Sequence, residues 1–526
     1  MRCRCVGVRC VRRIPQEAEN KLKGQEVIQF DNMLEKLAKQ SAIYGISTIV
    51  VRFLSYLLTP IYTRIFGQAA YGIVTDVYAL IPFALVLLSM GMESSYFRFA
   101  ARADAEGSDA EDIARRKRRL YATTWGATLV AAALFFTVVV LLRDRVAELM
   151  GEAYVGHSIY IVLVAAIILF DVATMIPFSR LREQGRAMRF VLLKACNVVI
   201  NVALAVVFQF IGLFDSDFGV GWVFVTNLVA SVVTLLLVIP SAGRVVPSIN
   251  WPLMRRIFAY SLPLLIGGLA GTAGELLDRQ LLKYLLPADI AFSQLGVYGA
   301  ITKIAVVIVL FTQMYRLAAE PFFLANFRKE EFVESNAAAM KYFIIFSMMI
   351  FLGIALFRDM FALIVGRDFR EGIFILPVIL GSNVLAGVWL NLSFWYKREE
   401  RTSLAIYVTF VGLAVTLLCN ILLVPRWGYF GAAWSRFAAE GAMVVVSYAL
   451  CRRYYPIPYD LRRIGEYVVL GLVLYFCGEA FVVWAEPGVV LRYGVALLLL
   501  ALYCGYAVRR EQIDPKALVR SMLRRG

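Results

Sequence analysis

The sequence has few of the residues and motifs on which soluble catalytic proteins depend. Charged residues make up 17% of the 526 residues, and histidine occurs only once, as His157. The eight cysteines do not form paired C-x2-C motifs at zinc-site spacing, so we expect no metal site and no cofactor. The patterns G-x-x-x-x-G-K-[ST], G-x-S-x-G and H-E-x-x-H do not occur. The chain therefore lacks the sequence signatures of ATP hydrolysis, serine hydrolysis and zinc proteolysis.

Apolar residues, in contrast, are abundant. Hydrophobic residues make up 60% of the chain, and its mean hydropathy is +0.71. Soluble domains are about half apolar and about a quarter charged. The composition excludes a soluble enzyme, a disordered regulator and a secreted disulfide scaffold, and it predicts a helical membrane protein with many spans. The net charge of +16 is then explained by topology-determining loop cations, without a nucleic-acid partner.

The apolar residues fall into stretches of membrane-spanning length. A hydrocarbon core of about 30 Å requires about 20 apolar residues in a helix. The sequence predicts fourteen such spans, at 41–63, 70–92, 120–142, 155–178, 189–211, 218–240, 257–278, 295–317, 341–365, 373–396, 402–424, 429–451, 464–485 and 489–508. Lys and Arg concentrate in every second loop, which predicts that both termini are cytoplasmic. None of the loops is long enough to form a catalytic domain.

Residues 1–32 differ from the rest of the chain, because they are basic and polar and lack an apolar signal-peptide core. Two interpretations remain open. The segment is a disordered cytoplasmic tail, or it is upstream sequence included by a mis-assigned start, with Met33 as the true first residue. We favour the second interpretation and expect no function from this segment.

Three pairs of segments indicate an internal duplication. LEKLAKQSA (34–42) matches MRRIFAYSL (254–262), the region of Gly72 matches that of Gly296, and GVGW (219–222) matches GAAW (431–434). The repeat has six spans, so both copies cross the membrane in the same direction. The sequence thus predicts an all-α protein with two parallel six-helix lobes around a central cavity, at 33–240 and 241–451. A helix pair at 452–508 and a basic tail at 509–526 follow.

Charged residues inside spans are costly, at roughly 2.5–3.5 kcal/mol each, so they are expected to face protein or a hydrated cavity. Five cations from both lobes are the candidate substrate-binding residues of a cationic cavity: Arg52, Lys194, Arg279, Lys303 and Arg436. Four acids are candidates for ion coupling or structural pairing: Asp76, Glu275, Asp278 and Glu440. The alternative is that these groups only neutralise one another, as in the i,i+4 pairs Glu275–Arg279 and Arg436–Glu440. A basic cavity in lipid favours an anionic, phosphate-bearing substrate.

Several segments resemble one known family. TRIFGQAAYG (63–72), ELLDRQLLKYLL (275–286) followed by LGVYGAITKI (295–304), and NILLVPRWGYFGAAW (420–434) are similar to segments of the polysaccharide transporter (Wzx-type) branch of the multidrug/oligosaccharidyl-lipid/polysaccharide exporter superfamily. The resemblance covers about residues 33–510. It implies that Arg52, Arg279 and Lys303 match basic cavity positions of the family.

The resemblance also implies an activity. The chain would be a flippase of the bacterial inner membrane, and it would not be an enzyme. It would move undecaprenyl-diphosphate-linked oligosaccharide units, for lipopolysaccharide O-antigen or another surface polysaccharide, by alternating access. Its partners would be this lipid-linked substrate, membrane lipids, H⁺ or Na⁺ as coupling ion, and the polysaccharide polymerase machinery. Two related activities stay open: a lipid II flippase of peptidoglycan synthesis, and a multidrug antiporter. A membrane enzyme is disfavoured because no large outer loop is present.

Overall fold

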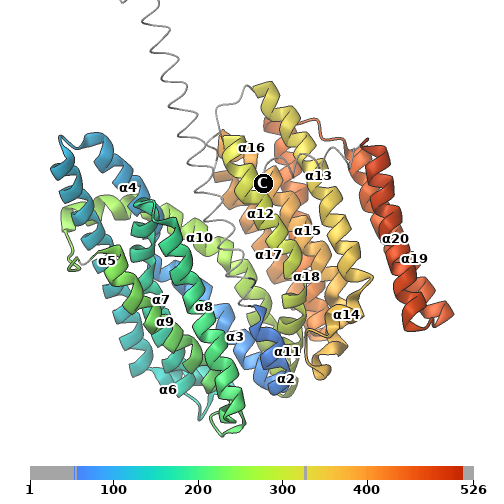
Figure 1. Cartoon of the computed structure of the whole chain (residues 1–526), viewed down its shortest axis with the longest axis horizontal. Helices are drawn as coiled ribbons and strands as arrows, with labels where there is room; N and C mark the ends of the chain where they lie inside the picture. Colours follow the sequence, from blue (N-terminus) through green and yellow to red (C-terminus); the bar gives the residue numbers. More distant parts are fainter. Residues whose placement is uncertain are drawn as a thin grey trace, which may run out of the picture.

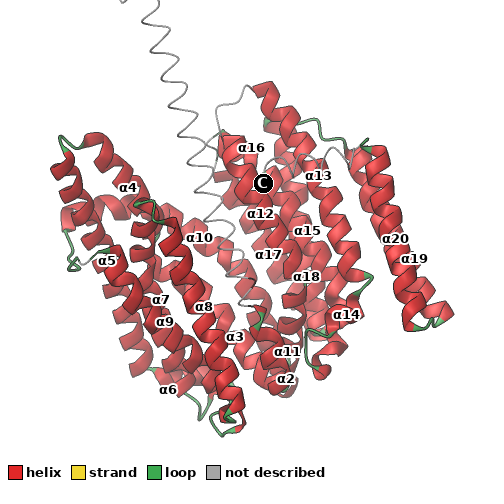
Figure 2. Ribbon diagram, in the orientation of Figure 1, coloured by secondary structure: helices red, strands yellow, loops and turns green. Residues whose placement is uncertain are grey.

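The computed structural model describes Phe53 and residues 56–512, except positions 244, 325–328, 400 and 402. Within these residues the secondary structure is helical and no β-strand occurs (Figure 2). The first helices are α2 (Leu58–Ile65), α3 (Gln68–Ser89), α4 (Met92–Glu106), α5 (Ala110–Leu141), α6 (Arg143–Met150), α7 (Ile159–Glu183), α8 (Ala187–Phe210), α9 (Gly221–Ala242) and α10 (Trp251–Leu285). The later ones are α11 (Ala288–Ile304), α12 (Val306–Leu324), α13 (Lys329–Ala355), α14 (Arg358–Ala362), α15 (Leu376–Leu392), α16 (Phe394–Arg398), α17 (Ser403–Trp427), α18 (Tyr429–Tyr454), α19 (Leu461–Ala485) and α20 (Val489–Arg510). The predicted all-α class is confirmed.

The helices follow the predicted spans closely. Each span from the second to the fourteenth falls on helical structure. Three of these spans cover two helices each: 295–317 covers α11 and α12, which bend by 49° at Ala305, 341–365 covers α13 and α14, and 373–396 covers α15 and α16. Among the described residues, eleven helices are long and apolar enough to cross a membrane, or twelve with the bent pair. Helix α18 is not among them, and it carries Arg436 and Glu440. Most of the first span lies outside the described residues, so the count of fourteen is not confirmed.

The helices form two groups and a separate hairpin (Figure 1). In the first group, which we call the N-lobe, α5, α7, α8 and α9 pack side by side, with α2, α3, α4 and α6. In the second group, the C-lobe, α11 to α18 pack together, with α17 and α18 in extensive contact. The hairpin of α19 and α20 packs on α13 at the edge of the C-lobe. The lobes lie close together where α2, α3 and α11 meet, and they diverge towards the end that carries α4 and α16.

Helix α10 crosses from one lobe to the other. At its first half, Arg98 of α4 lies over the ring of Tyr260, with 4.0 Å between the guanidinium carbon and the ring centroid. At its second half, α10 packs against α17 of the C-lobe, and it runs obliquely between the lobes in Figure 1. Between these halves lie Gly267 and Gly271, where a Cβ atom would meet no neighbour within 4 Å. Neither glycine is required by close packing, and glycine weakens a helix interior.

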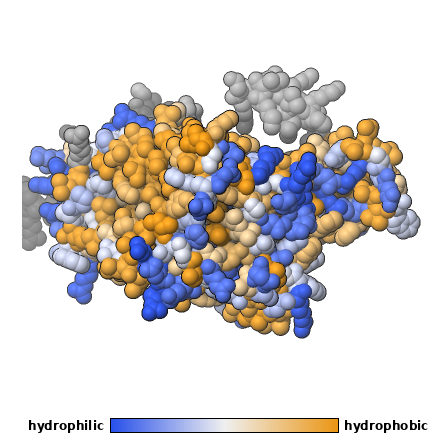
Figure 3. Space-filling view, turned by 90° about the horizontal axis from the view of Figure 1, so that it is seen from below, coloured by the Kyte–Doolittle hydropathy of each residue, from blue (hydrophilic) through white to orange (hydrophobic). Residues whose placement is uncertain are grey.

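The outer surface of the bundle is strongly apolar. Leu134, Phe210 and Trp484 are 64%, 86% and 90% exposed, respectively, and many other exposed side chains are apolar. Figure 3 views the end of the molecule that carries α2, α6 and α14, and hydrophilic residues there are interspersed among large hydrophobic patches. Contiguous apolar surface of this extent is unfavourable in water, and lipid chains cover it without cost.

Candidate functional site

A buried ion pair connects the two lobes. Asp76 on α3 is fully buried, and one of its carboxylate oxygens lies 2.8 Å from the Nζ of Lys283 on α10, which is 4% exposed. The same oxygen accepts a hydrogen bond of 2.8 Å from the Tyr154 hydroxyl. The other oxygen accepts one of 2.5 Å from Nε2 of Gln280. Because every donor is fixed by a helix or a packed loop, the carboxylate holds three segments together.

Further hydrogen bonds join the lobes beside this pair. Arg64 of α2 donates to the carbonyl oxygen of Leu363 at 2.8 Å. Gln68 donates to the Asp368 carbonyl oxygen at 2.7 Å and to the Glu371 carboxylate at 2.8 Å. These C-lobe residues belong to the segment that follows α14. We call this region, from α2–α3 on one side to α10, α11 and the 363–371 segment on the other, the lobe junction.

Glycines allow the backbones at the lobe junction to approach closely. A Cβ atom on Gly72 of α3 would lie 2.0 Å from the carbonyl oxygen of Phe292, and one on Gly296 of α11 would lie 2.0 Å from that of Gln68. No side chain fits at either position, because both neighbours are backbone atoms. Gly72 and Gly296 are the pair that the predicted internal repeat aligned, and they lie close to each other across the junction.

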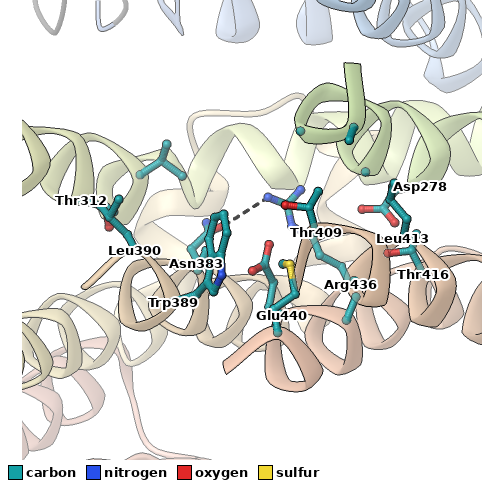
Figure 4. Close-up of a pocket in the computed structure, with 18 of the residues that line it drawn as sticks. Asp278, Thr312, Asn383, Trp389, Leu390, Thr409, Leu413, Thr416, Arg436 and Glu440 are labelled. Carbon is teal, nitrogen blue, oxygen red and sulfur yellow. Dashed lines mark hydrogen bonds between the residues drawn. The ribbon is translucent and has the colours of Figure 1, made fainter. Parts of the chain in front are cut away.

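A cavity of about 350 Å³ lies in the C-lobe, between α10, α12, α15, α17 and α18. Its lining includes three of the residues predicted from the sequence, Asp278, Arg436 and Glu440. Arg436 donates a hydrogen bond of 3.4 Å to the Asn383 side chain, and Figure 4 shows Asn383, Arg436 and Glu440 directed towards the same part of the cavity. The cavity is therefore lined by two cations, Arg436 and Arg316, by the two acids and by several neutral polar groups, at the depth of the spans.

Asp278 lies at another part of the cavity wall, beside Thr416 of α17 (Figure 4). It is 4% exposed, and one carboxylate oxygen lies 3.5 Å from Nδ2 of Asn420. Asn420 also donates to the Thr416 carbonyl oxygen at 2.8 Å, which fixes its side-chain orientation. This arrangement gives the cavity an acidic part near Asp278 and a mixed part near Arg436.

The other predicted cations that the structure describes, Lys194, Arg279 and Lys303, do not line this cavity. Lys194 lies on α8 in the N-lobe, with its Nζ 4.3 Å from the ring centroid of Phe178, and it interacts electrostatically with Asp171. Lys303 is on the last turn of α11, immediately before the bend, with its Nζ 5.2 Å from the ring centroid of Tyr56. Arg279 is half-buried on α10, one turn before Lys283. Of the four predicted cations that the structure describes, Arg436 alone lines this cavity.

Two predicted residues lie outside what the structure describes. Arg52 is among the undescribed positions of the first span, and the side chain of Glu275 on α10 is also not described. Their expected roles stay predictions. The structure adds residues that the sequence did not single out as site residues, namely Lys283, Gln280, Tyr154 and Asn383. Lys283 and Asn383 are polar residues in apolar spans, which is a usable signal, whereas Tyr154 lies in a short 3-10 helix between spans and gives none.

The same fold occurs in solved membrane transporters. The structure "Lipid II flippase MurJ, inward closed conformation" has a TM-score of 0.71 and 12% identity, covering 90% of this chain and 100% of that one. An inward-facing multidrug resistance MATE family transporter of the MOP superfamily has a TM-score of 0.63 and 16% identity, covering 79% and 97%. At such identities the likeness shows a shared fold. A search of curated protein sequences finds no match.

The apolar helices are those of a multi-pass membrane protein, and their fold is the one seen in these solved transporters. A family model described as polysaccharide biosynthesis protein matches residues 37–327, which is more than half of the chain. The chain belongs to this polysaccharide biosynthesis family. The resemblance noted in the sequence is thereby confirmed at the level of family and superfamily.

Proposed function

We propose that the chain is a flippase for oligosaccharide repeat units linked to undecaprenyl diphosphate. The observation that carries the proposal is the cavity of about 350 Å³ at membrane depth, with Arg436 in its wall, in a polysaccharide biosynthesis protein. A guanidinium group suits the geometry of a diphosphate. Asn383, Thr409 and Trp389 supply the polar and aromatic groups that sugars require. The prenyl chain stays in the lipid, so the cavity needs to hold only the polar head.

The arrangement of the lobes supports alternating access. The end at which the lobes diverge carries the α4–α5 loop, the α7–α8 turn and the start of α10, which contain the main clusters of Arg and Lys. By the loop-charge rule we assign this end to the cytoplasm of a bacterial inner membrane. The lobe junction is then periplasmic, and the structure corresponds to an inward-facing state. The expected next partner is the periplasmic polysaccharide polymerase machinery.

We further propose that the cavity acids couple transport to H⁺ or Na⁺. Asp278 and Glu440 are carboxylates within spans that line the same cavity as the proposed head-group residue Arg436. A cation bound by these acids and an anion bound by Arg436 would change each other's affinity by electrostatics over a short distance. Lys194, Lys303 and Arg279 are then assigned to the path of the head group outside this cavity, and Arg52 keeps its predicted role in binding the head group.

The test is a transport assay in proteoliposomes that contain a fluorescent undecaprenyl-diphosphate oligosaccharide. Wild type is expected to move the lipid between leaflets, and Arg436→Ala is expected to slow this transfer at least about tenfold, the loss of about one charge-assisted contact. Arg426→Ala is the matched control, because Arg426 is exposed at the end of α17 and does not line the cavity. Arg52→Ala tests the remaining sequence prediction in the same assay.

The deletion strain provides the complementary test. In this strain we expect undecaprenyl-linked repeat units to accumulate in the inner leaflet. Expression of the wild-type protein should remove this accumulation, and expression of Arg436→Ala should not. Normal surface polysaccharide in the deletion strain would refute the proposal. If the deletion abolished lipid II transfer and left surface polysaccharide normal, the protein would be a peptidoglycan flippase, whose substrate is also a sugar on a prenyl diphosphate. Loss of drug efflux would identify a multidrug antiporter.

A further inference from the structure

A second cavity, of about 310 Å³, lies far from the C-lobe cavity, at the end of the molecule where the lobes diverge. It is formed by α4, the first turns of α5 and the first turns of α10. Four arginines line it, together with a single acid, Glu106: Arg102, Arg116, Arg119 and Arg256. The remaining lining residues are apolar, apart from Asn250. We call this cavity the arginine pocket.

The walls of the arginine pocket are fixed by hydrogen bonds. The loop before α10 is bound to α5, because Ser248 donates its N–H to the Ala122 carbonyl oxygen at 3.1 Å. The Asn250 side chain caps α10 by accepting the Leu253 N–H at 3.1 Å. The pocket is therefore built from ordered helix ends. The N-terminus of α10 adds the positive end of its dipole to the arginine charges.

Only part of the arginine charge is neutralised within the protein. Arg102 pairs with Glu106 at 2.5 Å, and Arg116 pairs with Asp112 at 2.7 Å. Arg119 and Arg256 form no ion pair with any acid that the structure describes. Two guanidinium groups on neighbouring helices thus face one pocket without an internal counter-ion. Both are exposed at the pocket, so a site of this charge attracts an anion, and guanidinium forks match the geometry of phosphate oxygens.

The position of the pocket relative to the bilayer indicates the source of the anion. Trp251, the residue next to Pro252 of the pocket wall, is 73% exposed, and Phe258 and Leu262 further along α10 are 39% and 42% exposed. Tryptophan concentrates at membrane–water interfaces, and exposed apolar residues beyond it face the acyl chains. Helices α3 and α4 together cover 39 residues, well beyond the about 20 needed to cross the bilayer core. The pocket therefore lies at the level of the lipid head groups.

We propose that the arginine pocket binds a phosphate group, supplied by the head group of an acidic phospholipid of the surrounding leaflet. Arg119 and Arg256 contact the phosphate oxygens, and Phe99, Leu253 and Pro252 contact the adjoining glycerol backbone. Because the pocket joins α4 and α5 of the N-lobe to the start of the crossing helix α10, a bound lipid holds the first half of α10 to the N-lobe. This site is separate from the transport cavity, and the proposal does not depend on which substrate is transported.

The test is native mass spectrometry of the purified protein, titrated with phosphatidylglycerol or with phosphatidylcholine. Wild type is expected to bind phosphatidylglycerol at least about tenfold more tightly, which corresponds to about 1.4 kcal/mol. Arg119→Gln combined with Arg256→Gln is expected to abolish this preference. The matched control is Arg118→Gln combined with Arg255→Gln, which removes the same charge from the neighbouring positions of the same helices and leaves the pocket lining intact.

Three outcomes decide the proposal. Loss of the preference in the pocket variant, with retention in the control, supports it, provided that both variants are monodisperse and melt at the wild-type temperature in phosphatidylcholine nanodiscs. Equal loss in both variants would show only a general surface-charge effect and would overturn it, as would no preference in wild type. Titration with millimolar inorganic phosphate separates the sources: displacement of the lipid shows that soluble phosphate also occupies the site, and no displacement shows that the lipid alone does.

Discussion

The buried pair Asp76–Lys283 gives the sharpest prediction about movement between the lobes. Removal of one partner of a buried ion pair leaves an uncompensated charge and costs about 3–5 kcal/mol. The pair joins α3 to α10 across the lobe junction, so this cost applies to the state with the junction closed. When the lobes separate at this end, both groups become hydrated and the cost disappears. A loss of this size shifts the equilibrium away from the closed junction by between about 100-fold and about 5,000-fold.

The structure also ranks the two single variants. In Lys283→Met, the Asp76 carboxylate keeps the hydrogen bonds from Tyr154 and Gln280. The shift of the equilibrium away from the closed junction is therefore expected near the lower limit of about 100-fold. In Asp76→Asn, the Lys283 ammonium stays buried without a carboxylate partner, beside the rings of Tyr284 and Tyr154 at 4.5 and 6.0 Å, so the shift is expected near the upper limit of about 5,000-fold. The double variant buries no charge, and its effect is expected to be smaller than the sum of the two single effects.

The assay is oxidative crosslinking between Q68C and E371C, two positions whose wild-type side chains are hydrogen bonded across the lobe junction. Wild type is expected to crosslink readily, Lys283→Met less and Asp76→Asn least, with partial recovery in the double variant. Glu479→Gln is the control, because it breaks the buried pair Arg358–Glu479 between α14 and the α19 hairpin, at 2.9 Å, within one side of the molecule. Equal crosslinking in wild type and both single variants would refute the reasoning.

Three further predictions follow from particular contacts. Gly296→Ala places a methyl group 2.0 Å from the Gln68 carbonyl oxygen, so it is expected to abolish the Q68C crosslink and transport together. In the double variant Gly267→Ala/Gly271→Ala, neither added methyl group has a neighbour within 4 Å. Each substitution is expected to stabilise the helix by about 1 kcal/mol, measured as a higher melting temperature, and the stiffer helix is expected to slow transport. Burial opposes ionisation of Glu511, but hydrogen bonds from Lys341 and Tyr467 outweigh it and hold its pKa below the usual value. Its stabilisation is therefore present at neutral pH and lost as pH falls through that lowered pKa, so acid melting curves of wild type and Glu511→Gln should converge.

The helical architecture was predictable because each element depends on local composition. A run of about 20 apolar residues has one stable structure in a bilayer, the helix, so predicted spans and observed helices agree to within a few residues at most positions. The largest deviation is at 341–365, where α13 already ends at Ala355 and the short α14 follows. Apolarity alone does not distinguish one long span from a span followed by a short helix, because both bury the same side chains.

The site was predictable only in part. The cost of intramembrane charge singled out Asp76, Asp278, Arg436 and Glu440, and the structure places Asp76 in the interior and the other three in the cavity wall. It gave no information on which charges meet, since that depends on how α3 and α10 are placed relative to each other. The bond from Asp76 to Lys283, 207 positions further along the chain, depends on this placement. Lys194 and Lys303 satisfied the same sequence criterion and lie elsewhere, against the rings of Phe178 and Tyr56.

The course of helix α10 has a thermodynamic consequence for the whole molecule. Its first turns form one wall of the arginine pocket, its middle lines the C-lobe cavity, and Lys283 near its end closes the lobe junction. A ligand that binds more tightly to one arrangement of α10 stabilises that arrangement at the other two places. By linkage the effect is reciprocal. An anion in the arginine pocket changes the affinity of the C-lobe cavity for its ligand by some factor, and that ligand changes the affinity of the arginine pocket for the anion by the same factor. With a phospholipid in the arginine pocket and the head group in the C-lobe cavity, as proposed, the composition of the leaflet would determine how strongly the protein holds its substrate.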